Sequence, residues 1–248
     1  MPLQIGAASV ISRLSEFQSA VRNGMGATMK AILSTLLAAL ALVPAAQAER
    51  PVLIELFASQ NCKVCPQAYK TLRAVEKAHE GEVFILTWAV DYWDYLGEPD
   101  PLAIPAATER QAAYADRFGL RGPYTPQSVY DGAKECPATK EETINANIDD
   151  RRKVADTLDI EVSAGDGKRF AVDGALPAPA DIHLVSYVPE EDAFNGMVNP
   201  VVSTRKLGVW TGGPVTFSYT CERACAVIVQ ERGFGQVLAA RPLQARPD

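Results

Sequence analysis

Residues 52–65 of the chain read VLIELFASQNCKVC, and this stretch decides the fold. Its first six residues are apolar apart from one carboxylate, and a run of this length is typical of a buried β-strand. A short polar turn then leads to Cys62 and Cys65. Pro66 follows at once, and proline is favoured in the first turn of a helix, where its missing N–H needs no partner. The stretch therefore predicts a buried strand that ends at a Cys-x-x-Cys pair beside the start of a helix.

The residues that follow extend this stretch into an α/β unit. Apolar side chains recur at helical spacing up to Gly81, and residues 83–90 (VFILTWAV) form a second apolar run. A strand, a helix and a strand in this order predict a βαβ unit with parallel strands. Further on we expect an aromatic-rich loop, a helix, a short strand and another helix, which are residues 91–105, 106–118, 127–130 and 139–155.

In the last third of the chain the apolar period changes from that of a helix to that of a strand. Apolar and polar residues alternate around Val162, and Asp166-Gly167 is typical of a hairpin turn. We therefore expect two domains: an α/β domain of residues 49–157 and a smaller antiparallel β-domain of residues 158–248.

The longest uncharged apolar segment lies near the start of the chain and is typical of a signal peptide. Lys30 precedes the apolar residues 31–43, and Ala46-Gln47-Ala48 offers the small side chains that signal peptidase reads. A helix of this length spans about 20 Å, less than the ~30 Å of a membrane core. We expect residues 1–48 to comprise an over-extended start and a signal peptide cleaved after Ala48. The expected protein is periplasmic or secreted and has no stable membrane anchor.

The composition excludes one class of function. The chain has 248 residues, of which 48% are hydrophobic, and it carries 24 Lys and Arg against 30 Asp and Glu. The formal net charge is −6, and no run of basic residues occurs. A protein that follows a nucleic-acid backbone needs a basic face, so nucleic acid is not an expected partner.

A Cys-x-x-Cys pair occurs in redox sites, zinc sites and copper(I) sites. A zinc site needs four ligands, whereas this chain has no second such pair and its two histidines, His79 and His183, are far apart in sequence. We therefore expect no bound metal. At a strand-to-helix junction the first helical N–H groups stabilise a thiolate, and Lys63 adds a positive charge. These features indicate redox chemistry in which Cys62 attacks and Cys65 resolves the mixed disulfide.

Glu55 interrupts the first apolar strand. A buried carboxylate is costly unless it is paired or protonated, so its presence in this strand needs an explanation. We expect Glu55 to accept the proton that the Cys65 thiol loses, which would make it the third catalytic residue. The alternative is a carboxylate on an edge strand that points to water.

The order of the elements around the cysteines resembles the thioredoxin fold. In that fold a cis-proline before the third strand faces the Cys-x-x-Cys pair and binds the substrate backbone. The resemblance implies that Pro126 is cis, that Thr125 lies beside the sulfurs, and that a helical insertion precedes this proline.

A closer resemblance is carried by four motifs between about residues 52 and 132. They read ELFASQNCKVCPQA, VDYWDYLGEPDP, RQAAYA and YTPQSVYDG, and they occur in this order. Together they resemble the bacterial secreted thioredoxin-like family known as domain of unknown function 1223. The family name implies a fold and no particular activity.

Aromatic residues accompany the second strand and the Thr-Pro pair. Asp91 and Trp93 follow that strand, and Tyr124 precedes Thr125. We expect these side chains to line a substrate groove beside the Cys-x-x-Cys pair. The alternative is that the rings cap the core and that Asp91 is a turn residue.

The other three cysteines lie downstream. Cys221 and Cys225 flank a three-residue loop between apolar strands, and opposed positions on a hairpin suit a disulfide, so we expect a structural disulfide there. Cys136 is left without a partner. It is either a reactive thiol, on a strand parallel to the first one, or an inert packing residue.

These inferences together predict an exported thiol–disulfide oxidoreductase. Its substrate would be a protein or a small thiol, and a separate redox partner would restore it. No organic cofactor is expected, because the disulfide is itself the redox centre. The alternatives are a copper(I) chaperone and a non-catalytic binding module in which the Cys-x-x-Cys disulfide is structural.

Overall fold

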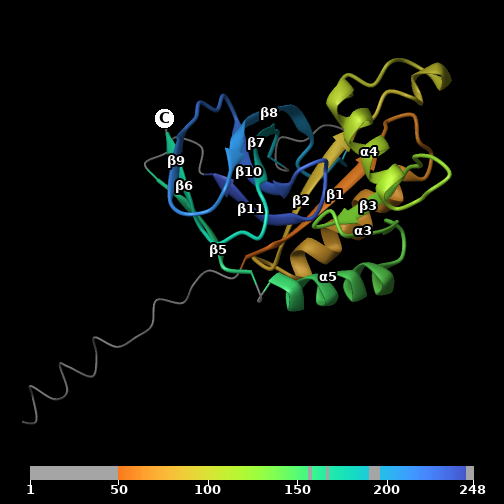
Figure 1. Ribbon diagram of the computed structural model, residues 1–248. Coiled ribbons are helices and arrows are strands. Elements are labelled where there is room, and N and C mark those ends of the chain that lie inside the picture. The colour runs from red at the N-terminus through yellow and green to blue at the C-terminus, as the bar shows by residue number, and fades with distance from the viewer. Residues whose placement is uncertain (1–49, 156–157, 166–167, 190–195, 244–248) are drawn as a thin grey trace, which may run out of the picture. The chain divides into compact units, whose positions relative to one another are not determined.

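The computed structural model describes residues 50–155, 158–165, 168–189 and 196–243 (Figure 1). The predicted signal peptide and the longer start before it, residues 1–48, lie outside the described residues. Among the helices of the described part, none has both the length and the apolar character needed to cross a membrane.

The first half of the described chain builds a four-stranded sheet around the predicted strand. The strand order is β2-β1-β3-β4, with bounds β1 Val52–Ala58, β2 Val83–Ala89, β3 Gln127–Tyr130 and β4 Lys134–Pro137. β1 is parallel to β2 and antiparallel to β3, and β3 is antiparallel to β4. Every residue of β1 and β2 is buried, because both strands are covered on both faces.

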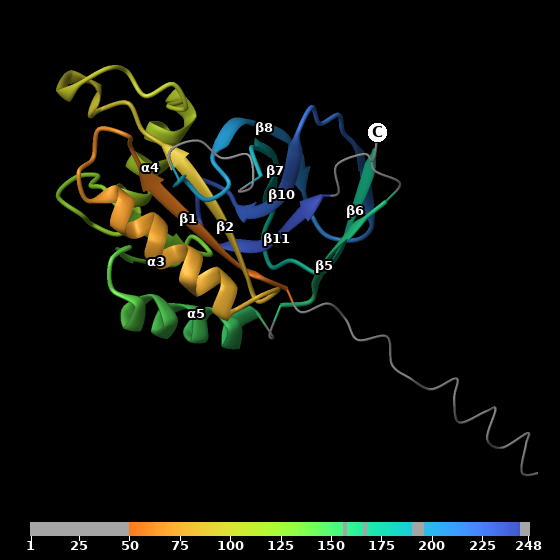
Figure 2. The same cartoon turned by 180° about the vertical axis from the view of Figure 1, so that it is seen from behind.

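Three helices cover this sheet. They are α3 (Cys65–Ala78), α4 (Pro105–Arg117) and α5 (Glu141–Ala155), and the loop after β2 also contains the short 3-10 helix η2 (Asp94–Leu96). α3 and α5 lie side by side against one face (Figures 1 and 2), while α4 packs on the opposite face. The predicted mixed α/β organisation is confirmed.

The second half forms two antiparallel sheets, as the strand period predicted. One has the order β11-β10-β7-β8 and the other the order β5-β6-β9. The strands are β5 Ile160–Ala164, β6 Arg169–Gly174, β7 Ala180–Tyr187, β8 Val201–Trp210, β9 Val215–Ser218, β10 Ala224–Glu231 and β11 Val237–Leu243. β5 and β6 pair across the predicted hairpin.

Strand β10 links the cores of the two halves. Ala226 and Ile228 pack in one cluster with Leu53 of β1, whereas the alternate residues Val227 and Val229 pack in another against the sheet of β5, β6 and β9. The sheet of β10 is therefore buried on both faces and covers the same face of the first sheet as α4. The described residues from Arg50 to Leu243 belong to one compact unit.

Cys221 and Cys225 form a disulfide with a Cα–Cα distance of 6.0 Å, as predicted. The hairpin that we expected around them is wrong. β9 pairs with β6, whereas β10 pairs with β7 and β11, so the two strands flanking the disulfide belong to different sheets. The disulfide therefore closes the chain segment that passes from one sheet to the other.

Replacing both cysteines, Cys221→Ser with Cys225→Ser, is expected to lower the free energy of unfolding by about 2 kcal/mol, because the five-residue loop gains freedom in the unfolded chain. Urea unfolding under non-reducing conditions measures this loss. Unchanged stability, or rapid alkylation of both thiols in the native wild type, would contradict a structural role.

Candidate active site

The turn that carries the two cysteines begins where β1 ends. Within it, the N–H of Cys62 donates to the carbonyl of Ser59 at 3.1 Å, and the N–H of Asn61 donates to the Ser59 hydroxyl at 3.1 Å. Cys65 is the first residue of α3 and forms a disulfide with Cys62 at a Cα–Cα distance of 5.4 Å. Cys62 keeps 6% exposure and Cys65 has none, so Cys62 is the more accessible of the two sulfurs.

The Thr-Pro pair meets the cysteines at the same edge of the sheet. The bond between Thr125 and Pro126 is cis, as the family resemblance implied. Phe57 pairs with Gln127, so Pro126 lies just before β3 and beside the end of β1, from which the cysteine turn departs. Pro126 and the disulfide therefore lie at the same edge of the sheet.

The aromatic loop after β2 is tied to this proline. The indole Nε1 of Trp93 donates to the Thr125 hydroxyl at 2.7 Å. Gln111 of α4 donates to the carbonyl of Tyr124 at 2.8 Å and accepts from the hydroxyl of Tyr92 at 3.1 Å. Gln111 thus connects the aromatic loop after β2 to the segment just before Pro126. The sequence did not indicate this role, because Gln111 lies within an amphipathic helix.

Two of the residues expected to line the groove, Asp91 and Tyr124, make hydrogen bonds to neighbouring elements. The exposed Asp91 accepts a hydrogen bond from the Thr108 hydroxyl at 2.7 Å, which ties the start of the loop to α4. The hydroxyl of the half-buried Tyr124 donates to Glu135 of β4. Asp91 therefore acts as a loop anchor, while the ring of Tyr124 remains beside Thr125.

Glu55 does not join the cysteines, and its predicted catalytic role is wrong. Ile54 and Leu56 pack in the cluster that contains both cysteines, whereas Leu53 and Phe57 pack in the cluster of α4. Since side chains alternate along a strand, Glu55 points to the α4 face. The alternative of an exposed edge carboxylate is also wrong, because β1 lies inside the sheet and Glu55 has no exposed surface.

The partner of Glu55 is Arg110 of α4. The guanidinium donates through Nε to Oε1 at 2.5 Å and through Nη2 to Oε2 at 3.0 Å, while the Tyr114 hydroxyl donates to Oε2 at 2.6 Å. Burial raises the pKa of Tyr114 well above its usual value, so this hydroxyl keeps its proton. The carboxylate is therefore satisfied by a structural ion pair.

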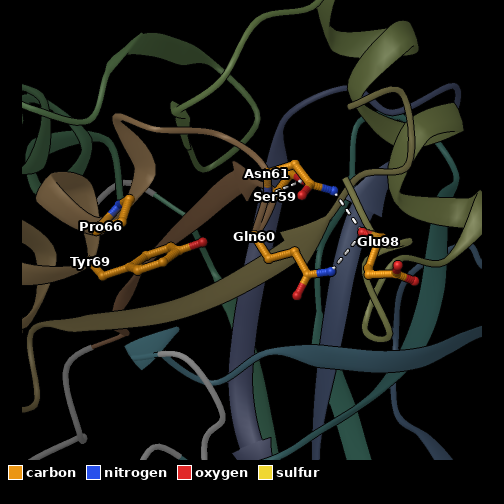
Figure 3. A pocket seen from close by; sticks show the side chains of 6 residues that line it. All are labelled: Ser59, Gln60, Asn61, Pro66, Tyr69 and Glu98. Carbon is orange, nitrogen blue, oxygen red and sulfur yellow. Dashed lines mark hydrogen bonds between the residues drawn. The ribbon is translucent and has the colours of Figure 1, made fainter. Parts of the chain in front are cut away.

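A pocket of about 430 Å³ adjoins the cysteine turn and is called here the Tyr69 pocket. It is lined by Ser59, Gln60, Asn61, Pro66, Tyr69 and Glu98 (Figure 3). Gln60 and Asn61 both donate to the carbonyl of Glu98 at 3.0 Å, which joins the cysteine turn to the loop after β2. A Cβ on Gly97 would lie 2.6 Å from Asn61 Oδ1, so any other residue at this position would displace the Asn61 side chain.

Comparison with known proteins places the chain in a family. A family model described as "Protein of unknown function (DUF1223)" matches residues 53–230. The chain belongs to the DUF1223 family. No curated protein matches this chain.

Two solved structures resemble this DUF1223 chain. A crystal structure of a structural-genomics target protein from Agrobacterium tumefaciens is 28% identical, covers 82% of this chain and 98% of its own, and has a TM-score of 0.71. HBP35 of Porphyromonas gingivalis is 12% identical, covers 80% of this chain and 77% of its own, and has a TM-score of 0.53. The second likeness is one of fold alone.

Cys136 of this DUF1223 protein is a free and buried thiol. It lies on β4, which runs parallel to β1 as expected, and its sulfur lies 3.5 Å from the Ser128 hydroxyl and 3.4 Å from the Tyr130 hydroxyl. These contacts favour the packing role over the reactive one.

No group of three or more metal-binding side chains occurs among the residues that the structure describes. His79 near the end of α3 contacts Glu82 and Asn145, and His183 lies on β7 in a different sheet. A copper(I) ion would therefore rely on Cys62 and Cys65 among the candidate ligands that the sequence suggested.

Proposed function

We propose that this DUF1223 protein is an exported thiol–disulfide oxidoreductase with a thioredoxin-like fold. The observation that carries the proposal is the meeting of a Cys62–Cys65 disulfide, at the start of α3, with the cis Thr125–Pro126 bond at the same sheet edge. The first supplies a two-electron redox pair, and the second offers backbone groups to an extended substrate.

The reaction is an exchange of disulfides. In the reduced protein the Cys62 thiolate attacks one sulfur of a substrate disulfide, forms a mixed disulfide and releases the other substrate sulfur as a thiolate. The Cys65 thiolate then attacks the Cys62 sulfur, restores the Cys62–Cys65 disulfide and releases the second substrate thiolate. Two electrons pass from the protein to the substrate, and a dithiol partner returns them by the same steps in reverse.

The local structure supports this division of roles. Cys62 is the sulfur with exposed surface, and the exposed Lys63 beside it contributes a positive charge that favours the thiolate. Cys65 is enclosed at the first turn of α3, where an attack on it from outside is blocked. Trp93 orients Thr125, which we assign with Pro126 to the substrate edge.

Export is part of the proposal. The signal-like segment before Glu49 would deliver the protein to the periplasm or the medium, where disulfides persist. The Cys221–Cys225 disulfide supports an oxidising location, since disulfides are rare in a cytosol, where thiols are kept reduced. The substrate would be a protein or a small thiol.

Insulin reduction with dithiothreitol as the dithiol donor tests the activity. Cys62→Ser is expected to bring the rate to the uncatalysed background, and Cys65→Ser should accumulate a mixed disulfide with the substrate. The double variant Cys221→Ser with Cys225→Ser is the matched control and should keep the wild-type rate. Activity that survives Cys62→Ser would overturn the assignment.

The two alternatives are separated by measurements on the same protein. A reduction potential of the Cys62–Cys65 pair below about −300 mV would favour a structural disulfide and a binding module. Stoichiometric copper(I) that is lost in Cys62→Ser would favour the chaperone. A potential above that value with no retained copper is the result that the oxidoreductase predicts.

A further inference from the structure

The Tyr69 pocket contains a buried hydroxyl that has no partner. Tyr69 lies one helical turn after Cys65 and is 4% exposed, and its hydroxyl makes no hydrogen bond within the described part of the chain. Figure 3 shows this hydroxyl pointing into the pocket, toward Ser59 and Gln60. Burial raises the pKa of Tyr69, and the charge of Asp100 raises it further, so the phenol is neutral and offers a lone pair and a proton.

The carboxylate of Asp100, which has no basic partner among the described residues, acts on this hydroxyl through its charge. Asp100 is 5% exposed, and its two oxygens accept the N–H groups of Gln60 at 2.7 Å and Leu102 at 3.0 Å. Within the described residues no Lys, Arg or His nitrogen lies within salt-bridge distance of Asp100 or of Glu98, which lines the pocket. The loop of residues 91–101 contains four carboxylates and no basic residue.

These groups define what the pocket can bind. Asp100 is not one of the residues that line the pocket, but its charge acts on Tyr69, and water screens a buried carboxylate less than an exposed one. Glu98 supplies the carboxylate of the lining itself. The Tyr69 oxygen supplies an acceptor, and a volume of about 430 Å³ is ample for one long side chain. Lys63 is exposed and does not line the pocket, so its ammonium group does not pair with the carboxylate of the lining.

We propose that the Tyr69 pocket is a specificity subsite that takes the Lys or Arg side chain of a polypeptide substrate. The proposal rests on the oxidoreductase function and adds a substrate class to it. Asn61 and Pro66 line the pocket and are the covalent neighbours of Cys62 and Cys65. A cationic side chain bound there holds a cysteine of the same peptide at the reactive disulfide.

Synthetic peptides test the subsite through the rate of exchange. Each peptide carries one cysteine, as its symmetric disulfide, and has Lys, Gln or Glu at one of the three positions on either side. The reduced wild-type protein is expected to react about tenfold faster with a Lys peptide than with its Gln counterpart at the best position, and more slowly still with Glu. The preference should shrink in high salt.

Two variants assign this preference to the pocket. Tyr69→Phe and Glu98→Gln should each reduce the Lys-to-Gln rate ratio to about threefold or less. Tyr69→Phe should not lower the melting temperature, because the hydroxyl it removes has no partner. Tyr95→Phe, on the exposed part of the same loop, and Glu80→Gln, beyond the far end of α3, are the matched controls and should keep the full ratio.

The outcomes separate the subsite from the proposed function. Equal rates for Lys, Gln and Glu peptides at every position would overturn the subsite while leaving the oxidoreductase intact. If no peptide reacts, binding of the same labelled peptides in thiol form to Cys62→Ser is measured by fluorescence anisotropy. Tighter binding of Lys peptides that Tyr69→Phe abolishes would then support the subsite and reject the oxidoreductase.

Discussion

Arg110→Met is expected to lower the free energy of unfolding by about 3–5 kcal/mol, the largest loss that we foresee for a single substitution in this chain. The change leaves the Glu55 carboxylate without its cation at a site with no exposed surface. It also removes the guanidinium from the rings of Trp88 and Tyr114, whose centroids lie 5.1 and 5.2 Å away. Urea unfolding at pH 7, with both disulfides intact, measures the loss.

Two further variants show whether the uncompensated charge is the cause. Adding Glu55→Gln to Arg110→Met should recover part of the loss, because the amide is neutral and still accepts from the Tyr114 hydroxyl. Arg117→Met on the same helix is the matched control. Its side chain is 44% exposed and lies 3.9 Å from Glu231, so it should cost less than about 1 kcal/mol. A loss below 1 kcal/mol for Arg110→Met, or a double variant less stable than the single one, would contradict this account.

The helices and strands whose signal lies in residues adjacent in the sequence could be predicted. The apolar runs of β1 and β2, the proline after Cys65 and the strand period after residue 158 each depend on neighbours within about ten residues, and the structure places these elements where they were expected. The cis state of Pro126 was instead implied by the resemblance of the element order to the thioredoxin fold. Local pattern and family resemblance together gave the sheet edge at which the site lies.

The face to which a side chain points could not be predicted for the buried strands. β1 is apolar on both faces, so its sequence carries no alternation that says which residues share a face with the cysteines. The partner of Glu55 lies 55 residues away on α4, and nothing near either residue marks the pair. A carboxylate in an apolar strand was a sound signal of a special role, but the role is structural.

Contacts between distant segments explain the other differences. β9 and β10 lie next to each other in sequence and looked like one hairpin, yet each pairs with strands of its own sheet. The Tyr69 pocket went unnoticed for the same reason, because Tyr69 and Asp100 are brought together only when the loop after β2 folds over the cysteine turn. Pairings of this kind depend on the whole core.

Asp131 gives the second large effect, and it depends on pH. Burial raises the pKa of Asp131 from 3.8 to about 6, although Arg50, the N–H of Leu53 and Arg151 each lower it in part. Between pH 4 and 6 the folded chain therefore holds a proton that the unfolded chain has lost. The contribution of Asp131 to stability is greatest below pH 4 and declines as the pH rises through 6, by about 3 kcal/mol for a shift of about two units.

Asp131→Asn is expected to remove this dependence. The amide does not titrate, keeps an oxygen for the N–H of Leu53, and tolerates the positive φ of 45° at this turn. The free energy of unfolding of the variant, minus that of the wild type, should therefore rise by about 2.5 kcal/mol from pH 4 to pH 7. Urea unfolding at pH 4, 5, 6 and 7 gives the difference, and Asp150→Asn, which removes a half-exposed carboxylate, is the matched control for the loss of one charge.

The comparison has to be made between variants, because His183 acts in the opposite direction. Burial lowers the pKa of His183 from 6.5 to about 4, so its contribution to stability is present above pH 6.5 and is lost as the pH falls toward 4. The two groups partly cancel in the wild type, whose own pH profile can be nearly flat over this range. Subtracting the wild type from Asp131→Asn removes the His183 contribution. A difference that stays constant from pH 4 to 7, or falls, would show that Arg50 and Arg151 hold Asp131 ionised in the folded chain.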